Sequence, residues 1–295
     1  MMKEVKVKQG KLRRVKPFPY FMVLPTILVL CVFTFYPFLR SIYLSFFITT
    51  PMGTPGAFVG FKNFTRIYGS PEFLNSLKAT LRYAAMVAVG TFTISMCLAM
   101  LSIKIVKGCK VYQTMYALPM AIASVPVSAL ATYIFSYYGI INNIFGLQIS
   151  WFDDPTMAPI MTAIVTIWSC VGTSFLYLLV GFRNVPNDLV EASTLDGAGT
   201  FRQLMTVYIP LASPQIFFVM FLNILSSFKA FAIIKLLTGK GPGDSTNILV
   251  YAVYSNAFVR GRFETACVYS LALVLLIFVV TRVQLLCEKK AVHYQ

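Results

Sequence analysis

The sequence predicts an all-α protein that crosses a membrane several times. Of its 295 residues, 58% are hydrophobic and only 12% are charged, whereas soluble domains carry about 25% charged residues. A bilayer-spanning helix needs about 20 mostly apolar residues. Six segments meet that length, and they are residues 20–43, 82–103, 114–137, 157–181, 215–237 and 265–286.

These segments leave no room for a large soluble domain. We expect a basic N-terminal arm at 1–19, a transmembrane domain at 20–287 and a short tail at 288–295. The first apolar segment follows basic residues, as in a signal peptide, but it is too long and has no small-residue cleavage site. We therefore expect it to be retained as a membrane span.

The charge distribution predicts the orientation in the membrane. The net charge is +15, and basic residues that flank spans are expected from membrane insertion alone, so this charge does not indicate nucleic-acid binding. With the N-terminus inside, the inner segments hold fifteen basic and five acidic residues, against eight and five outside. Both termini are therefore predicted to be cytoplasmic. The four inner segments are 1–19, 104–113, 182–214 and 282–295.

Motifs for metal, cofactor or catalytic chemistry are missing from the sequence. The six cysteines show no CxxC spacing, and the single histidine, His293, lies in the tail. No phosphate-binding loop of the form Gly-x-x-x-x-Gly-Lys-Ser/Thr occurs, so the chain has no ATP site of that kind. We expect no cofactor, no metal and no catalytic residue.

The longest polar connection is the predicted inner loop 182–214, which reads as two short helices around a sharp turn. Pro186 suits the first turn of a helix, and the acids Asp188 and Glu191 follow where the helix dipole favours negative charge. Asp196-Gly197 then predicts the helix end, because glycine adopts the left-handed conformation that closes a helix.

The second half of this loop predicts another helix. Thr200 followed by Gln203 fits a capping box, and Pro210 limits how far the helix continues. Side chains around the turn are small, so another protein surface can approach closely; the alternative is a hairpin packed on its own membrane domain. The small residues are Ala192, Ser193, Gly197, Ala198 and Gly199.

The fifth apolar segment concentrates polar side chains that are costly inside a membrane. We expect Asn223, Ser227 and Lys229 to lie on a translocation path, with Phe228 and Phe231 as stacking surfaces for a sugar ring. If the helix starts at Gln215, Lys229 lies about 21 Å along it, beyond the middle of a ~30 Å hydrocarbon core. The alternative is hydrogen bonding between helices, with the lysine reaching outward.

The polar loop resembles a known family signature, namely E-A-A, three residues, G, nine residues, and I-x-L-P. Ser replaces the second Ala, Val replaces Ile and Ile replaces Leu. The signature marks inner-membrane permease subunits of binding-protein-dependent ABC importers, and Asp196-Gly197-Ala198 resembles its carbohydrate branch. The matching residues are Glu191, Ala192, Ser193, Gly197, Val207, Ile209 and Pro210.

Other segments extend the resemblance over most of the chain. Residues 58–64, 112–119 and 238–246 are similar to segments before the second helix, in the third helix and outside the fifth helix of these permeases. The resemblance implies that the loop is a coupling helix on a cytoplasmic ATPase dimer. There Glu191 would meet a basic group, and Asp196, Gly197, Ala198 and Gly199 would form the turn.

The resemblance also implies the partners and the substrate class. A second homologous permease would complete the channel, an extracytoplasmic solute-binding protein would deliver a sugar or oligosaccharide, and the complex would lie in a bacterial cytoplasmic (inner) membrane. One alternative is import of glycerol-3-phosphate or a related phosphorylated solute by the same architecture. A remote alternative is a stand-alone secondary transporter, which often shows internal repeats; we find none.

Overall fold

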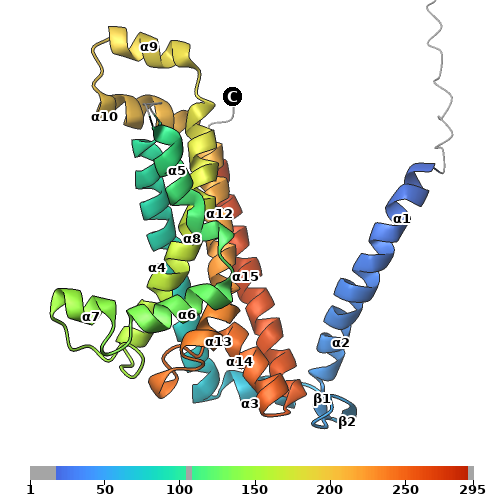
Figure 1. Cartoon of the computed structure of the whole chain (residues 1–295). Helices are drawn as coiled ribbons and strands as arrows, with labels where there is room; N and C mark the ends of the chain where they lie inside the picture. Colours follow the sequence, from blue (N-terminus) through green and yellow to red (C-terminus); the bar gives the residue numbers. More distant parts are fainter. Residues whose placement is uncertain (1–17, 104–107, 292–295) are drawn as a thin grey trace, which may run out of the picture. The chain divides into compact units, whose positions relative to one another are not determined.

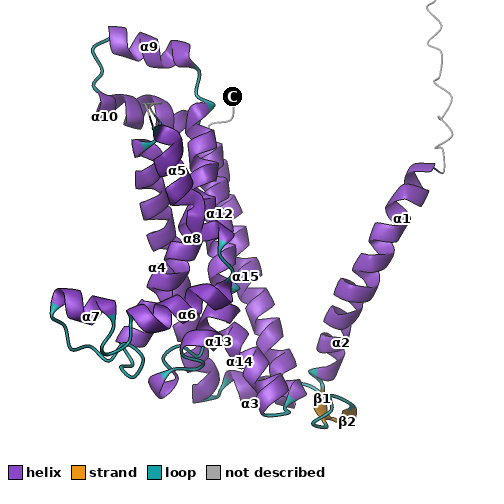
Figure 2. Cartoon of the chain, in the orientation of Figure 1, coloured by secondary structure: helices purple, strands orange, loops and turns teal. Residues whose placement is uncertain are grey.

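A computed structural model describes residues 18–103 and 108–291 (Figure 1). Figure 2 shows that the described chain is mostly helical, with one small pair of strands. Most of the predicted arm 1–19 and the tail residue His293 lie outside the described residues. The elements, with η for a 3₁₀ or π segment, are α1 (Phe18–Leu30), η1 (Cys31–Phe35), α2 (Tyr36–Leu44), β1 (Phe47–Thr49), β2 (Pro55–Phe58), α3 (Lys62–Tyr68), α4 (Pro71–Leu101), α5 (Cys109–Ala117), η2 (Leu118–Ala121), α6 (Ser124–Ile134), α7 (Ile140–Phe145), α8 (Met157–Arg183), α9 (Asn187–Leu195), α10 (Thr200–Gln203), η3 (Leu204–Tyr208), α11 (Ile209–Leu211), α12 (Ser213–Phe228), α13 (Phe231–Leu237), η4 (Pro242–Asp244), α14 (Leu249–Tyr254), η5 (Ser255–Val259) and α15 (Phe263–Ala291).

The chain divides into two units, Met1–Tyr43 and Leu44–Gln295. The described part of the first unit is the run α1–η1–α2, which is continuous and apolar enough to cross a membrane from Phe21 to Leu44. All side chains from 21 to 40 are exposed. A helix that is apolar on every side needs an apolar environment, so this run has the character of a membrane span.

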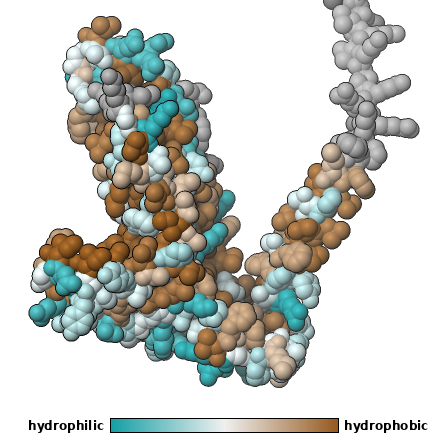
Figure 3. All heavy atoms as spheres, viewed as in Figure 1, coloured by the Kyte–Doolittle hydropathy of each residue, from teal (hydrophilic) through white to brown (hydrophobic). Residues whose placement is uncertain are grey.

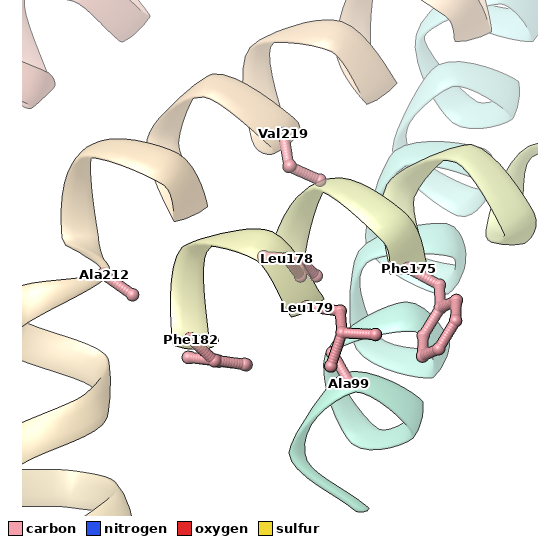
Figure 4. Close-up of a cluster of buried hydrophobic side chains, with 7 residues drawn as sticks. All are labelled: Ala99, Phe175, Leu178, Leu179, Phe182, Ala212 and Val219. Carbon is pink, nitrogen blue, oxygen red and sulfur yellow. The ribbon is translucent and has the colours of Figure 1, made fainter. Parts of the chain in front are cut away.

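The second unit is built on three long helices, α4, α8 and α15, each long and apolar enough to span a bilayer. The tightest pairing joins α4 to α8, and α12 packs on both. Figure 4 shows one of the buried clusters between these helices, formed by Ala99, Phe175, Leu178, Leu179, Phe182, Ala212 and Val219.

One close approach depends on a glycine. A Cβ on Gly172 of α8 would lie 2.9 Å from the backbone oxygen of Ala117 at the end of α5. Because small residues let helix backbones approach closely in membranes, this glycine allows α5 to lie directly on α8.

The predicted all-α membrane fold is confirmed, and several predicted spans differ in their limits. The described part has four helices of spanning length, or up to six if each bent helix pair counts as one span. The second helix begins at Pro71 rather than at residue 82, with Ser70 as its N-cap, whose hydroxyl accepts the amide of Phe73. Serine is a favoured N-cap because it satisfies an amide that the helix leaves free.

The third predicted helix is broken. α5 and α6 form a pair bent by 101° around the 3₁₀ turn η2. Pro119 lies in this turn, and Ile122 is extended. Proline removes an amide donor and clashes with the preceding turn, so the predicted segment 114–137 is bent rather than one continuous helix.

The fifth predicted helix is also broken, and it contains neither proline nor glycine at the break. α12 ends at Phe228 and α13 begins at Phe231. The Phe231 amide donates to the Lys229 carbonyl at 2.7 Å, and Ala230 has φ −72° and ψ 54°, which is the geometry of an inverse γ-turn. Lys229 therefore lies at the end of a helix. Its predicted position, within one continuous helix, was wrong.

The strands dock on the start of α15. The hydroxyl of Thr49 in β1 accepts a hydrogen bond from the Glu264 amide at 3.1 Å. The same hydroxyl donates a hydrogen bond to the Glu264 carboxylate at 2.5 Å. This reciprocal pair resembles a capping box, but its two members are 215 residues apart in sequence. The hairpin thus fixes the first turn of α15.

The two ends of the bundle carry different parts of the chain. Figure 1 shows the end of α4, the start of α5, the α9–α10 loop and the end of α15 at one end. The other end holds α3, α7, α13 and α14 (Figure 1). The described parts of three predicted inner segments, residues 108–113, 182–214 and 282–291, therefore reach the same end of the unit. Hydrophilic residues gather mainly at the ends of the bundle (Figure 3).

Candidate functional site

The first helix of the polar loop begins where the sequence predicts. Pro186 is the N-cap of α9, with φ −59° and ψ 130°, and Asp188 lies in the first turn. The proline therefore precedes the helix by one position, and the acid meets the positive end of the helix dipole. Glu191 follows on the exposed surface of α9.

The end of α9 is a Schellman motif. The Ala198 amide donates to the Ser193 carbonyl and the Gly197 amide donates to the Thr194 carbonyl, each at 3.0 Å. Gly197 has φ +76°, in the left-handed region that glycine adopts without a Cβ clash. The predicted stop at Asp196-Gly197 is therefore present, with Asp196 as the C-cap.

The second helix of the loop is capped differently from the prediction. Its N-cap is Gly199, and no side chain caps it. Gln203 is buried and donates from Nε2 to the Thr194 hydroxyl at 2.8 Å. The predicted capping box at Thr200 was wrong, because Gln203 instead joins the second helix to the first.

The rest of the second helix reaches Pro210. The helix continues through the π segment η3 into α11, where Pro210 occupies an early position. It meets α12 beyond Leu211 at a bend of 74°. Proline thus marks the end of the loop, and the bend turns the chain into the bundle.

The first helix of the loop does not pack into the protein core. None of the residues of α9 is buried, and Leu195 is 90% exposed. Phe201, at the start of α10, is 73% exposed. Figure 1 shows α9 beyond the ends of the bundle helices and over α10. This arrangement differs from a hairpin packed on its own membrane helices, and it leaves apolar side chains available to a partner.

The predicted path residues do not gather on one surface. Asn223, Ser227 and Phe228 are buried, whereas Lys229 is exposed. Phe231 lies in an aromatic group with Tyr251 and Tyr254.

Asn223 is paired within the protein. The Ser174 hydroxyl of α8 donates to the Asn223 Oδ1 at 2.6 Å, while the Asn223 Nδ2 is buried without a hydrogen-bond partner. Ser227 donates to the Ile224 carbonyl of its own helix at 2.6 Å. These contacts are the helix–helix and local bonding that the sequence left as the alternative to a path.

Two pairings near the broken fifth segment were missed by sequence reasoning. The first is the bond from Ser174 to Asn223, since nothing local in the sequence identifies the partner of Ser174 on α12. Lys235 lies over the ring of Tyr254 with its Nζ 4.2 Å from the centroid, and 5.7 Å from that of Phe231. The pairing of a lysine with aromatic rings is a cation–π contact, and the Tyr254 ring comes from a different element.

A protein-family model matches this chain over residues 106–293, which is more than half of its length. The model describes the inner-membrane component of binding-protein-dependent transport systems. The matched range includes α5 to α15 and therefore the whole polar loop.

Curated relatives match nearly end to end. The sn-glycerol-3-phosphate transport system permease protein UgpA of Rhizobium meliloti is 31% identical over 290 residues, covering 95% of this chain and 97% of the relative. Its counterpart in Pectobacterium atrosepticum is 30% identical over 282 residues, covering 94% and 96%.

Solved structures share the fold. A bacterial ABC transporter that imports the acidic polysaccharide alginate has a chain that matches with a TM-score of 0.81 and 20% identity, over 92% of this chain and 95% of that one. The alginate transporter in complex with a periplasmic protein that holds an alginate pentasaccharide matches with a TM-score of 0.82, 20% identity, and 92% and 94% coverage.

Proposed function

The chain belongs to the family of inner-membrane components of binding-protein-dependent transport systems, and on that premise we propose that it forms half of the channel of an ATP-driven importer. The chain is the transport subunit, and ATP hydrolysis belongs to a separate subunit. A second, homologous permease completes the channel, and two copies of a cytoplasmic ATPase drive it. An extracytoplasmic solute-binding protein delivers the solute.

The exposed loop carries this proposal. α9 buries none of its residues, and its turn at Gly197 has open space around it, since a Cβ there would meet nothing within 4 Å. Such a helix fits a cleft on another protein through apolar side chains such as Leu189 and Leu195, which are 46% and 90% exposed. Glu191 engages a basic group of the ATPase.

Force passes from the loop into the bundle. Gln203 joins α9 to α10 through Thr194, and the same run of helix continues to Leu211 and then bends into α12. ATP binding closes the ATPase dimer, draws the two coupling loops together and opens the channel outward. Hydrolysis and product release reset it.

The solute is a sugar or an oligosaccharide. A second candidate is glycerol-3-phosphate or a related phosphorylated solute, because the UgpA relatives, at 30–31% identity, are permease proteins of sn-glycerol-3-phosphate transport systems. Asn223, Ser227, Phe228, Lys229 and Phe231 remain the proposed contacts of the path, and the Nδ2 of Asn223, which has no hydrogen-bond partner, is the atom of that side chain left for the solute.

The protein lies in the bacterial inner membrane with both termini on the cytoplasmic side. Together with the N-terminal arm, the predicted inner segments 104–113, 182–214 and 282–295 carry fifteen basic residues, against eight in the outer segments. Their common end in the fold supports a single cytoplasmic face that includes the coupling loop (Figure 1).

Replacement of Gly197 by aspartate tests the coupling role. We expect Gly197→Asp to abolish uptake while membrane insertion and abundance stay normal, because a side chain at φ +76° distorts the turn. Asn143→Asp, an exposed change at the opposite end of the bundle, is the control and keeps uptake. Unchanged uptake by Gly197→Asp would contradict the coupling assignment.

The substrate is tested on the reconstituted complex with its solute-binding protein. ATP hydrolysis is measured across a panel of neutral sugars, oligosaccharides and glycerol phosphates, and the transported solute is the one that stimulates it. A transporter that works as a single protein without ATP would instead support the secondary-transporter alternative.

A further inference from the structure

A polar cavity of about 390 Å³ lies at the end of the bundle opposite the coupling loop. This volume is within the range of about 300–1,000 Å³ that is typical of small-molecule sites. The cavity belongs entirely to the second unit, between the starts of α4 and α15 and the segments α3 and η5. Its lining is rich in charged and polar groups, including Arg66, Ser70, Glu72, Asn256, Arg262 and Glu264.

The two acidic residues of the cavity already have partners. Glu72 forms an ion pair with Arg260 at 2.6 Å. Glu264 is only 7% exposed, and its carboxylate accepts the hydroxyl of Thr49. Arg260 therefore balances the charge of Glu72, whereas the neutral hydroxyl of Thr49 leaves the charge of Glu264 in place. Counting Arg66, Arg260 and Arg262, the arginines at the cavity exceed its two carboxylates by one charge.

The two lining arginines have no acidic partner among residues 18–103 and 108–291. Arg66 is held in place by Asn63, whose Oδ1 lies 3.3 Å from its guanidinium. Asn63 is itself fixed, since its amide donates to the carbonyls of Ser45 and Phe47 at 2.9 Å. Arg262 stands at the start of α15 and is exposed.

The helix geometry adds to this positive field. α4 has 31 residues and α15 has 29, and both begin at the cavity with the partial positive charge of a helix N-terminus. At ~1.5 Å per residue each is more than 40 Å long, so their first turns can extend beyond a ~30 Å hydrocarbon core into water. A metal ion is not favoured, because the described residues contain no group of three or more metal-ligating side chains.

From this cavity, its two guanidinium groups without an acidic partner and its position we infer that the outer end binds a small anionic solute, a sugar or polyol that bears a carboxylate or a phosphate. The arginine forks match the planar oxygens of either group, and neutral hydroxyls of the solute can meet Ser70 and Asn256. The site gives the importer a preference for anionic solutes as they reach its outer mouth. This inference rests on the proposed import function for its biological role, but the binding itself does not.

The test uses the full-length protein in lipid nanodiscs, without ATPase, and measures binding of two matched pairs by calorimetry. Glucuronate is compared with glucose, and glycerol-3-phosphate with glycerol, so that the two pairs distinguish a carboxylate from a phosphate ligand. At least one charged solute is expected to bind tenfold or more tightly than its neutral partner, and its affinity is expected to fall as salt is raised.

Variants locate the site. Arg66→Gln and Arg262→Gln are each expected to lower the binding affinity for the charged solute tenfold or more, because each removes a charge-assisted hydrogen bond. Arg82→Gln is the control, since Arg82 is an exposed arginine of α4 outside the cavity, and it is expected to stay within twofold. Thermal unfolding of each variant reports whether it folds as the parent does.

A second measurement needs no variant. Phenylglyoxal modifies accessible arginines, and mass spectrometry of the unaltered protein is expected to show protection of Arg66 and Arg262, but not of Arg82, by the charged solute. Equal binding of charged and neutral solutes, no binding by any of the four, or equal losses in all three variants would overturn the inference. Normal binding together with failed ATP-driven uptake would instead count against the proposed importer function.

Discussion

At the residue scale, the loop depends on two glycines with different tasks. Gly197 closes α9 with φ +76°, whereas Gly199 begins α10 with φ −66°, which any residue adopts. An added Cβ would meet no atom within 4 Å at either position. The backbone conformation alone therefore distinguishes them, and this makes them a matched pair.

We predict that Gly197→Ala loosens the end of α9 by about 1 kcal/mol, since a left-handed L-residue costs roughly 1–2 kcal/mol. Gly199→Ala is expected to have little effect. Amide hydrogen exchange of residues 193–198 measures both, with faster exchange only in the first variant. Equal protection in both variants would show that the turn is not held by its glycine.

Ser174 and Asn223 form a second residue-scale pair, buried between α8 and α12. We predict that Ser174→Ala destabilises the protein by about 1–3 kcal/mol, because it leaves buried Asn223 without its partner. Adding Asn223→Leu is expected to recover much of this loss, since removing both polar partners can be nearly neutral. Thermal unfolding in detergent measures the series.

Ser169→Ala is the control for that series. Ser169 lies on the same helix, but its hydroxyl donates only to the Val165 carbonyl of that helix, so its loss leaves no other side chain unpaired. If Ser169→Ala destabilised the protein as much as Ser174→Ala, the loss could not be attributed to the Ser174–Asn223 bond.

At the element scale, the long helices were predictable from the sequence. Of the two breaks, one is marked by a proline and the other is not. α8 follows its predicted range of 157–181 within two residues, because a long uninterrupted apolar run has few alternatives in a membrane. Pro119 lies in the turn between α5 and α6, where a proline disfavours a continuous helix. The break at Lys229 and Ala230 has no proline or glycine, so no residue type in the local sequence marks it.

The same limit applies within the coupling loop. The Schellman turn at Gly197 follows from local sequence, because only one residue type readily takes that conformation. The role of Gln203 does not, since its partner Thr194 lies in the preceding helix. Local pattern alone favoured a capping box, and the contact between helices replaced it.

We predict that Gln203→Ala separates α9 from α10 and weakens coupling. The lost hydrogen bond is worth about 0.5–1.5 kcal/mol, so ATP hydrolysis by the reconstituted complex is expected to continue while solute uptake per ATP falls. Thr194→Val removes the other partner of the same hydrogen bond. The double variant is therefore expected to lose little more uptake per ATP than Gln203→Ala alone. Thr206→Val is the control, because that hydroxyl donates only to the Arg202 carbonyl of its own helix.

At the scale of the whole molecule, the second unit has a polar loop at one end and a charged cavity at the other. The charge distribution predicts that 104–113, 182–214 and 282–295 lie on the same side of the membrane. The fold brings the described parts of these segments to one end of the unit (Figure 1). The proposed docking helix and the proposed anion site lie at opposite ends of this unit, as expected if ATP acts at one face of the membrane and the solute arrives at the other. This assignment is correct only if the end that carries the polar loop faces the cytoplasm and the end that carries the cavity faces outward.

Two exposed residues at opposite ends report that orientation. Leu195 in the loop is 90% exposed and Tyr138 before α7 is 84% exposed, so each tolerates a cysteine without loss of core packing. In a background with the six native cysteines replaced by alanine, we predict that an impermeant thiol reagent labels Tyr138→Cys on intact cells. Leu195→Cys is expected to react only after the membrane is opened, because the basic flanks hold its end inside. The reverse pattern would put the loop beyond reach of any cytoplasmic ATPase and would refute the coupling role together with the topology.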